Sequence, residues 1–439
     1  MFKKLIIALI AMVCIMTSSV LALTSSSYLI ANTAINLIDF DEAYSQFKKS
    51  DEKLSESDLN YKLLAFVNLG LLFDAKEVAG DILKINNLNQ EALIVHLTYA
   101  KKNNILYVFD EYRKRTNMSE MTLLNYIFFN EGGKIRKNEM IARSIFEVVQ
   151  TTLADEKGQE NYKILLFYLS IANLLDPYFN EGYFYSAQIY QILKNYNKAE
   201  YFYQKIQINH YLYVNSQKNI AINKSKLGFF DQGEEQLLNL IKDYSNDVKL
   251  LFALADLYRI EKKYQEAINY YTKIINSKNN LLSELWRVFY LRGICYERLF
   301  QWNLAEKDLL YSLKIEPNSP QVLNYLAYGW LERDENLNKA MIMLQKAYKA
   351  NPKSYYILDS LAWAYYKKNQ LEKAAQLMEE VIVLAPGEAI SLDHLGDIYF
   401  AMKRKREAKY FWQQALDLAE PEDMIADTLK KKLEQYNAG

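Results

Sequence analysis

The chain has 439 residues, of which 51% are hydrophobic and 14% aromatic, with 53 lysines and arginines against 53 aspartates and glutamates. The hydrophobic content excludes a chain that is disordered throughout, and the balanced charge excludes a general attraction to nucleic acid or anionic lipid, so we expect no nucleic-acid partner. Glycine (13) and proline (6) are scarce, which favours long helices over a fold rich in tight turns.

Residues 1–22 have the three-part pattern of a secretory signal peptide. Lys3 and Lys4 precede an apolar run that ends at Met16, and polar residues then lead to a stretch of short side chains that ends at Ala22. We therefore expect cleavage after this residue and export of the rest of the chain. Two alternatives stay open: the segment remains uncleaved as a membrane anchor, which also exports the chain, or it forms the first helix of a cytosolic fold. An uncleaved segment is the one membrane contact that the sequence indicates.

Residues 25–178 carry weak signs of a helical repeat. The stretches INLIDFDEAYSQF (35–47) and LGLLFDAKEVAGDIL (69–83) place apolar and small residues at helical spacing. From about residue 100 onward the helical periodicity continues, but the positions of the small residues drift. We expect degenerate helical hairpins in this region, stacked in the same solenoid as the stronger repeats that follow.

A clear internal repeat occupies residues 180–421. Pro317, Pro352, Pro386 and Pro421 recur every 34 or 35 residues, and each follows an amphipathic stretch. Proline cannot continue a helix, so each one marks the end of a second helix. Seven units with this register fit into the region, and each is expected to form two antiparallel helices.

Two positions of the 34-residue unit hold only alanine or glycine. The eighth position holds Ala187, Ala221, Ala255, Gly293, Ala327, Ala362 and Gly396, and the twentieth holds Ala199, Gly233, Ala267, Ala305, Ala340, Ala374 and Ala408. Small residues are needed there because two helices cross closely only where no large side chain intervenes. The eleventh position is aromatic in six units and Lys224 in the other, and one unit has an extra residue near Glu335.

This pattern, as in LAWAYYKKNQLEKAAQLMEEVIVLAP (361–386), resembles the tetratricopeptide repeat family. The resemblance implies an all-α fold, a right-handed superhelix of stacked antiparallel helix pairs in which the first helix of each pair lines the concave side. Residues 422–439 follow the last unit and place apolar residues on one face of a helix. We expect them to form a capping helix and tail that close the array.

The family's pattern also indicates a candidate site for a protein or peptide partner. Five positions of each first helix point into the groove in the family, and in the last three units they include Asn324, Tyr328, Tyr356, Asp359, Trp363, Tyr366, Asp393 and Asp397. Amide and carboxylate oxygens accept hydrogen bonds from an extended backbone, and aromatic rings hold its side chains. The alternative is a binding patch elsewhere on the superhelix. Relatives that bind chaperone tails hold a carboxylate with cations, whereas these positions are acidic, so such a tail fits poorly.

Residues 322–423 show longer matches, in VLNYLAYGWLE, DSLAWAYY and DHLGDIYF. They resemble envelope tetratricopeptide proteins of Gram-negative bacteria, a group that includes a lipoprotein adaptor for a carboxyl-terminal processing protease. The resemblance implies a scaffold or adaptor in the periplasm or cell envelope that presents substrates to a protease, although the residues around Cys14 do not form a lipoprotein signal. The alternative is a membrane-anchored architectural subunit of a cell-wall or secretion complex. Nothing in the sequence sets an oligomeric state.

No motif of an enzyme occurs in a suitable context, so we expect no catalytic residues, no cofactor and no metal. The three histidines lie far apart in the sequence. His394 stands between Asp393 and Asp397, a cluster that could suggest catalysis. The repeat register instead places the two aspartates one turn apart on the groove face and rotates His394 toward the interface between repeats. We interpret this histidine as structural, and an enzyme remains the last alternative.

Overall fold

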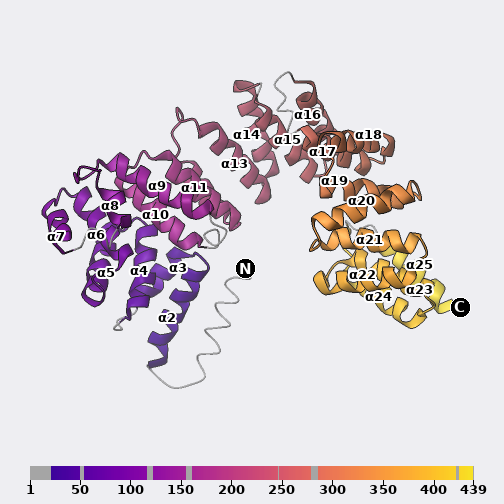
Figure 1. Ribbon diagram of the computed structural model, residues 1–439, viewed down its shortest axis with the longest axis horizontal. Coiled ribbons are helices and arrows are strands. Elements are labelled where there is room, and N and C mark those ends of the chain that lie inside the picture. Colours follow the sequence, from indigo (N-terminus) through magenta and orange to yellow (C-terminus); the bar gives the residue numbers. More distant parts are fainter. Residues whose placement is uncertain are drawn as a thin grey trace. The chain divides into compact units, whose positions relative to one another are not determined.

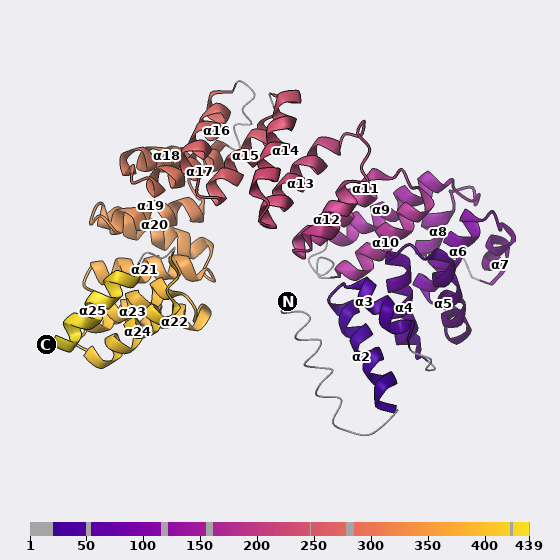
Figure 2. The same ribbon diagram turned by 180° about the vertical axis from the view of Figure 1, so that it is seen from behind.

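A computed structural model describes residues 21–49, 54–115, 122–154, 161–245, 247–277, 285–421 and 425–438. Within these ranges the named elements are all α-helices, and the β-structure is confined to one isolated bridge between Phe129 and Ile135. The predicted all-α solenoid of helix pairs is therefore confirmed. Apart from its last two residues, the predicted signal peptide (1–22) lies outside the described ranges. The chain divides into two units, Met1–Leu240 and Ile241–Gly439, whose helices are labelled in Figures 1 and 2.

The first unit begins with three helical hairpins. They are followed by three further helices and by two more hairpins, and the last helix of the second of these hairpins runs across the division between the units. The helices are α2 (Leu21–Asn36), α3 (Phe40–Phe47), α4 (Glu56–Asn68), α5 (Leu72–Ile85), α6 (Gln90–Lys102), α7 (Tyr107–Arg115), α8 (Thr122–Phe128), α9 (Asn138–Ala154), α10 (Tyr162–Leu175), α11 (Asn180–Ile192), α12 (Tyr196–Tyr203), α13 (Tyr213–Lys226) and α14 (Phe230–Asp243).

Helix α10 departs from the simple stacking that we expected for residues 25–178. A solenoid repeat contacts only its neighbours along the chain, whereas α10 packs against α4 and α6 as well as α9 and α11, an arrangement that both views show (Figures 1 and 2). The Ser170 hydroxyl donates to the Asn68 amide oxygen over 3.1 Å, and Lys163 donates to Asn36 over 2.8 Å. The reason is composition: YKILLFYLSIANLL is apolar nearly all round, so this helix is buried on several sides.

The second unit consists of five regular hairpins and a final helix. The helices are α15 (Val248–Ile260), α16 (Tyr264–Asn276), α17 (Leu285–Arg298), α18 (Trp302–Ile315), α19 (Pro320–Leu331), α20 (Leu337–Ala350), α21 (Tyr355–Lys367), α22 (Leu371–Leu384), α23 (Ala389–Ala401), α24 (Lys405–Leu418) and α25 (Ala426–Ala438). Helix α25 packs on α24 and buries Leu429 and Leu433 there. It occupies the place of the predicted capping helix.

The small residues of the repeat lie where the two helices of a hairpin meet. The side chains at the eighth and twentieth positions are fully buried wherever they are alanine. A Cβ on Gly396 would collide with the indole ring of Trp412, and one on Gly233 would collide with the backbone oxygen of Ala221. The contacts explain why large side chains are absent from these positions, and why Gly396 and Gly233 are glycine.

One type of turn closes the first helix of each of the seven hairpins between α11 and α24. A residue with left-handed φ ends the helix, and the next backbone N–H donates over 2.8–2.9 Å to the carbonyl of the eleventh-position residue. This is the Schellman arrangement, which satisfies a carbonyl that the helix leaves unpaired. The left-handed residues are Lys194, Gly228, Lys262, Phe300, Asp334, Asn369 and Lys403. The extra residue near Glu335 is accommodated in such a turn, where Asn336 also has a positive φ of 47°.

Candidate functional site

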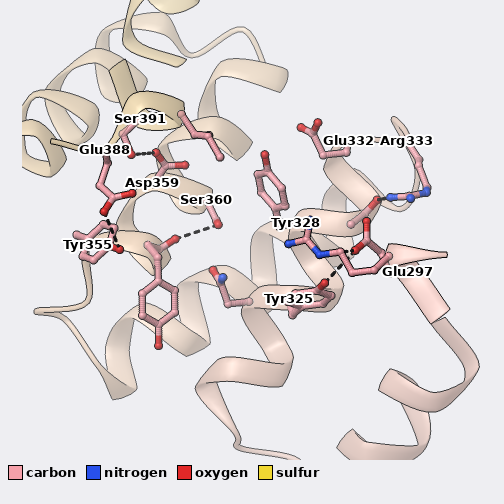
Figure 3. A pocket seen from close by; sticks show the side chains of 15 residues that line it. Glu297, Tyr325, Tyr328, Glu332, Arg333, Tyr355, Asp359, Ser360, Glu388 and Ser391 are labelled. Atoms are coloured by element: carbon pink, nitrogen blue, oxygen red, sulfur yellow. Dashed lines mark hydrogen bonds and ion pairs between the residues drawn. The ribbon is translucent and has the colours of Figure 1, made fainter. Parts of the chain in front are cut away.

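A cavity of about 620 Å³ opens on the first helices of four consecutive hairpins in the second unit. Its volume lies within the roughly 300–1,000 Å³ typical of ligand sites. The lining residues come from α17, α19, α21 and α23 and the residues that flank these helices, and none comes from a second helix (Figure 3). They are Glu297, Arg298, Asn324, Tyr325, Tyr328, Gly329, Glu332, Arg333, Tyr355, Tyr356, Asp359, Ser360, Glu388, Ile390 and Ser391.

Helix α19 supplies the centre of the cavity. Pro320 stands at the first turn, where its fixed φ favours helix formation, and the buried apolar residues of α19 pack against α20 and α21. This packing turns Tyr325 and Tyr328 toward the cavity, with Asp359 on one side of Tyr328 and Glu297 on the other (Figure 3). The repeat fold thus aims the polar residues of this helix at the open space.

Three glutamates of the lining are each held by one donor. Glu297 accepts a hydrogen bond from the Tyr325 hydroxyl over 3.0 Å, and Glu332 accepts one from the Trp363 indole over 2.9 Å. Glu388 accepts from the Tyr355 hydroxyl over 3.3 Å. A carboxylate has about four acceptor sites. Each of these side chains is therefore oriented by the protein while it keeps the capacity to accept further hydrogen bonds.

One buried polar atom of α19 lacks a hydrogen-bond partner among the described residues. The Asn324 side-chain oxygen is buried and accepts no hydrogen bond there. Burial, reinforced by the carboxylates of Glu332 and Asp359, raises the pKa of Tyr328 well above its usual range, so its hydroxyl keeps its proton. An unpaired buried acceptor thus lines the same cavity as the protonated Tyr328 hydroxyl, and leaving the acceptor unpaired is costly unless a ligand or water pairs with it.

Asp359 is buried at the interface of α21 with α23. It accepts a hydrogen bond from the Ser391 hydroxyl over 2.6 Å, and its Oδ1 lies 3.0 Å from Nδ1 of His394. The His394 ring also stacks on Trp363, with the ring centroids 4.1 Å apart. Burial alone would lower the pKa of His394, but the nearby carboxylates, Asp359 first among them, outweigh burial and raise it. His394 thus links two hairpins, as the interpretation of a structural residue requires.

Asp393 and Asp397 are paired with a lysine from outside the repeats. Lys432 of α25 places Nζ 2.6 Å from Asp393 and 2.8 Å from Asp397, and Trp412 donates its indole N–H to Asp397 over 3.0 Å. Burial and the neighbouring Asp397 raise the pKa of Asp393, while Lys432 opposes this shift. Helix α25 therefore covers the part of the groove face that these two aspartates occupy.

The eight predicted groove residues fall into three places. Four of them, Asn324, Tyr328, Tyr356 and Asp359, line the large cavity. Tyr366 and Asp397 line a smaller cavity of about 240 Å³ beside Lys432. Trp363 and Asp393 are buried in the packing between helices. That these residues bind a partner remains a prediction.

The repeat register could have found two lining residues that sequence reasoning missed. Glu297 and Arg298 occupy the twelfth and thirteenth positions of the preceding unit, counted from Gly293 as the eighth. The predicted groove residues come from the last three units only, so they do not include this unit. No signal pointed to Lys432, because it lies outside the repeats.

Within the described ranges, no group of three or more His, Cys, Asp or Glu side chains is placed so that it could hold a metal ion. The same part of the chain contains no helix that is both long and apolar enough to cross a membrane.

The hairpin geometry and the cavity on the first helices define an α-solenoid built from repeated helix pairs. Residues 219–280 and 335–389 match the family model of the tetratricopeptide repeat. These two segments thus carry tetratricopeptide repeats, and proteins with such repeats generally bind other proteins.

Two curated relatives carry the same repeat. A TPR repeat-containing protein of Pseudomonas aeruginosa is 29% identical over 110 residues, which cover 25% of this chain and 18% of the relative. A TPR repeat-containing protein of Methanocaldococcus jannaschii is 24% identical over 387 residues, which cover 75% of this chain and 63% of the relative. The chain therefore spans less than two thirds of the length of either relative.

Solved structures with similar helical arrays include the APC/C heterotetramer Cut9–Hcn1 and yeast Tom70. The first is 16% identical, with 94% of this chain and 83% of that chain covered and a TM-score of 0.48. The second is 14% identical, with 94% and 89% covered and a TM-score of 0.39. At these values neither likeness extends to function.

Proposed function

We propose that this chain is a protein-binding scaffold of the cell envelope, and that it holds an extended segment of a partner protein in the cavity on α17, α19, α21 and α23. The observation that carries the proposal is the unpaired Asn324 oxygen in that cavity, which the Tyr328 hydroxyl also lines. A peptide backbone offers both the N–H and the C=O that would pair with them. The exposed faces of Tyr356 and Ile390 add apolar contact beside these polar groups.

The cavity also has the shape that an extended ligand needs. Its lining comes from four successive first helices, so it runs across hairpins. The aromatic side chains Tyr325, Tyr328, Tyr355 and Tyr356 supply a large contact area with few rotatable bonds, as is common at protein interfaces.

The test places a photo-crosslinking amino acid at Tyr356, which is 40% exposed in the cavity, or at Tyr410, which is 58% exposed on the second helix α24. In living cells, a partner bound in the cavity crosslinks to position 356 and not to position 410, and mass spectrometry identifies it. Crosslinking of the same partner at position 410 but not at position 356 would show that the binding surface lies on the second helices. That result would refute the cavity as the site.

The finer proposal is that the scaffold presents substrates to an envelope carboxyl-terminal processing protease. It is supported by the resemblance of residues 322–423 to an adaptor of that kind. The purified chain is mixed with such a protease and candidate cell-wall hydrolases, and faster degradation is expected. An unchanged degradation rate across the candidates, with the crosslinked partner intact, would count against the adaptor function and leave the scaffold function standing.

A further inference from the structure

Three equivalent positions form a ladder along the groove face of the second unit. The fifth residue of each first helix, counted with the small residue as the eighth, is Asn324 in α19, Asp359 in α21 and Asp393 in α23. We call these positions the first, second and third rungs. Each rung presents a side-chain oxygen, and an oxygen acceptor buried in protein requires a donor.

The chain itself supplies donors to two of the three rungs. At the third rung, the Lys432 ammonium lies 2.6 Å from Asp393. At the second rung, the His394 imidazole lies 3.0 Å from Asp359, and its pKa is raised by the surrounding carboxylates. The neutral Ser391 hydroxyl also donates to Asp359 over 2.6 Å, but Lys432 and His394 are side chains that carry or can carry a positive charge. At two of the three positions, the side-chain oxygen is thus already paired with a basic side chain of the same protein.

The first rung is open. The Asn324 oxygen is buried and accepts no hydrogen bond from the described residues. The same cavity is lined by the carboxylates of Glu297 and Glu332, each of which keeps unused acceptor sites. Acidic groups in a partly buried cavity favour a cation more strongly than they would in open solvent.

The two arginines of the lining do not fill this position. The Arg333 guanidinium lies 4.0 Å from the centre of the Trp302 ring and donates to the backbone oxygen of Gly329 over 2.9 Å. Arg298 is 53% exposed, and its Nε is 3.7 Å from Glu297, beyond hydrogen-bond distance. Four carboxylates therefore face two guanidinium groups in the lining.

We propose that a lysine or arginine side chain of the bound segment completes the first rung, donating to Asn324 and pairing with Glu297 and Glu332. The inference rests on the proposed peptide-binding function and adds the chemistry of the ligand. A charge-assisted hydrogen bond in a partly buried site is stronger than a neutral one, so this side chain is an anchor of the interaction. The partner is a protein with a basic residue in an extended segment.

The test begins with selection of random dodecapeptides, displayed on phage, against the full chain. Lysine or arginine is expected to be enriched at one aligned position of the selected peptides. In a synthetic copy of the best peptide, replacement of that lysine by norleucine, which keeps the aliphatic chain and removes the charge, lowers affinity about tenfold or more. This comparison needs no change in the protein, so it is independent of protein folding.

Charge-neutral variants then locate the partner group. Glu297→Gln and Glu332→Gln each weaken the lysine peptide severalfold and leave the norleucine peptide unchanged. Glu380→Gln, at an exposed carboxylate on the second helix α22, is the matched control and changes neither.

The outcomes separate the two levels of the proposal. Selected peptides without basic residues, or equal affinity of the lysine and norleucine peptides, overturn the inference and leave peptide binding standing. If no peptide is enriched by the full chain, the proposed binding of extended segments fails, and this inference fails with it.

Discussion

Nδ1 of His394 lies 3.0 Å from Oδ1 of Asp359, across the interface between helices α23 and α21. The histidine is enclosed by groups from three helices: Asp359 and Trp363 of α21, Tyr328 and Glu332 at α19, and Asp393 of its own helix. The carboxylates raise its pKa above the usual 6.5 in spite of burial. The contact therefore makes the stability of this interface depend on pH.

The sign of that dependence follows from the raised pKa of His394. Below about pH 6.5 the folded and unfolded chains both hold the proton, and the contribution to stability is complete. As the pH rises through the folded-state pKa, the proton leaves and the contribution is lost. Urea unfolding followed by circular dichroism, in steps from about pH 6 to pH 9, should show a decline in the unfolding midpoint that is smaller in His394→Gln. An equal decline in both proteins would show that His394 is not its source.

Lys432 is predicted to hold helix α25 in place. Lys432→Met leaves the buried Asp393 without its ion pair, with a cost of about 1–3 kcal/mol. Limited proteolysis should release the segment from residue 426 onward faster in this variant. The control is Lys431→Met, which changes an exposed neighbour and should behave as the original chain.

A double-mutant cycle shows whether this effect comes from the ion pair. Asp393→Asn combined with Lys432→Met should recover part of the lost stability, because the uncompensated buried charge is gone. If the losses of the two single changes simply add, the two residues are not coupled.

The contact between Gly396 of α23 and Trp412 of α24 provides a packing test. In Gly396→Ala, the new methyl group meets the Trp412 ring, so the ring shifts and weakens its hydrogen bond to Asp397. We expect a loss of about 1–3 kcal/mol in the free energy of unfolding. Gly387→Ala is the matched control, since a Cβ there has no neighbour within 4 Å, and it should be neutral or slightly stabilising. Comparable losses in both variants would argue against the steric explanation.

Export and processing are tested on the protein made in a Gram-negative cell. We propose that the mature chain begins at Leu23 and is recovered in the periplasmic or envelope fraction, because residues 1–22 have the pattern of a signal peptide. Mass spectrometry of the purified N-terminus gives the answer. An intact N-terminus in the membrane fraction favours the anchored architectural subunit instead, and recovery from the cytosol contradicts export.

The repeat was predictable because its constraints are local. Ala362 and Ala374 are small since the two helices of one hairpin touch at those points, and the need recurs every 34 or 35 residues. The same register correctly identified helix α23 and put His394 at the interface with α21. Periodicity of this kind is visible in a single sequence.

The groove was harder to predict because its exposure depends on distant parts of the chain. Asp393 has the groove-facing register, but Lys432, 39 residues later, covers it. Trp363 has the same register as Tyr328, yet it is buried against His394. Helix α10 reaches α4 through contacts about 100 residues apart, such as Ser170 with Asn68. Such contacts leave no periodic signal in the sequence.

The repeated turn gives this array a set of built-in reporters. In each of the seven hairpins one backbone N–H forms the same bond to the eleventh-position carbonyl, from Asn195 in the first to Arg404 in the last. Since the bond geometry is nearly constant, differences in hydrogen exchange among these seven amides measure how readily each hairpin opens. Read in order along the chain, they give a stability profile of the array at the resolution of a single repeat, and a ligand bound across α17 to α23 would appear as slower exchange at Gln301, Glu335, Gln370 and Arg404.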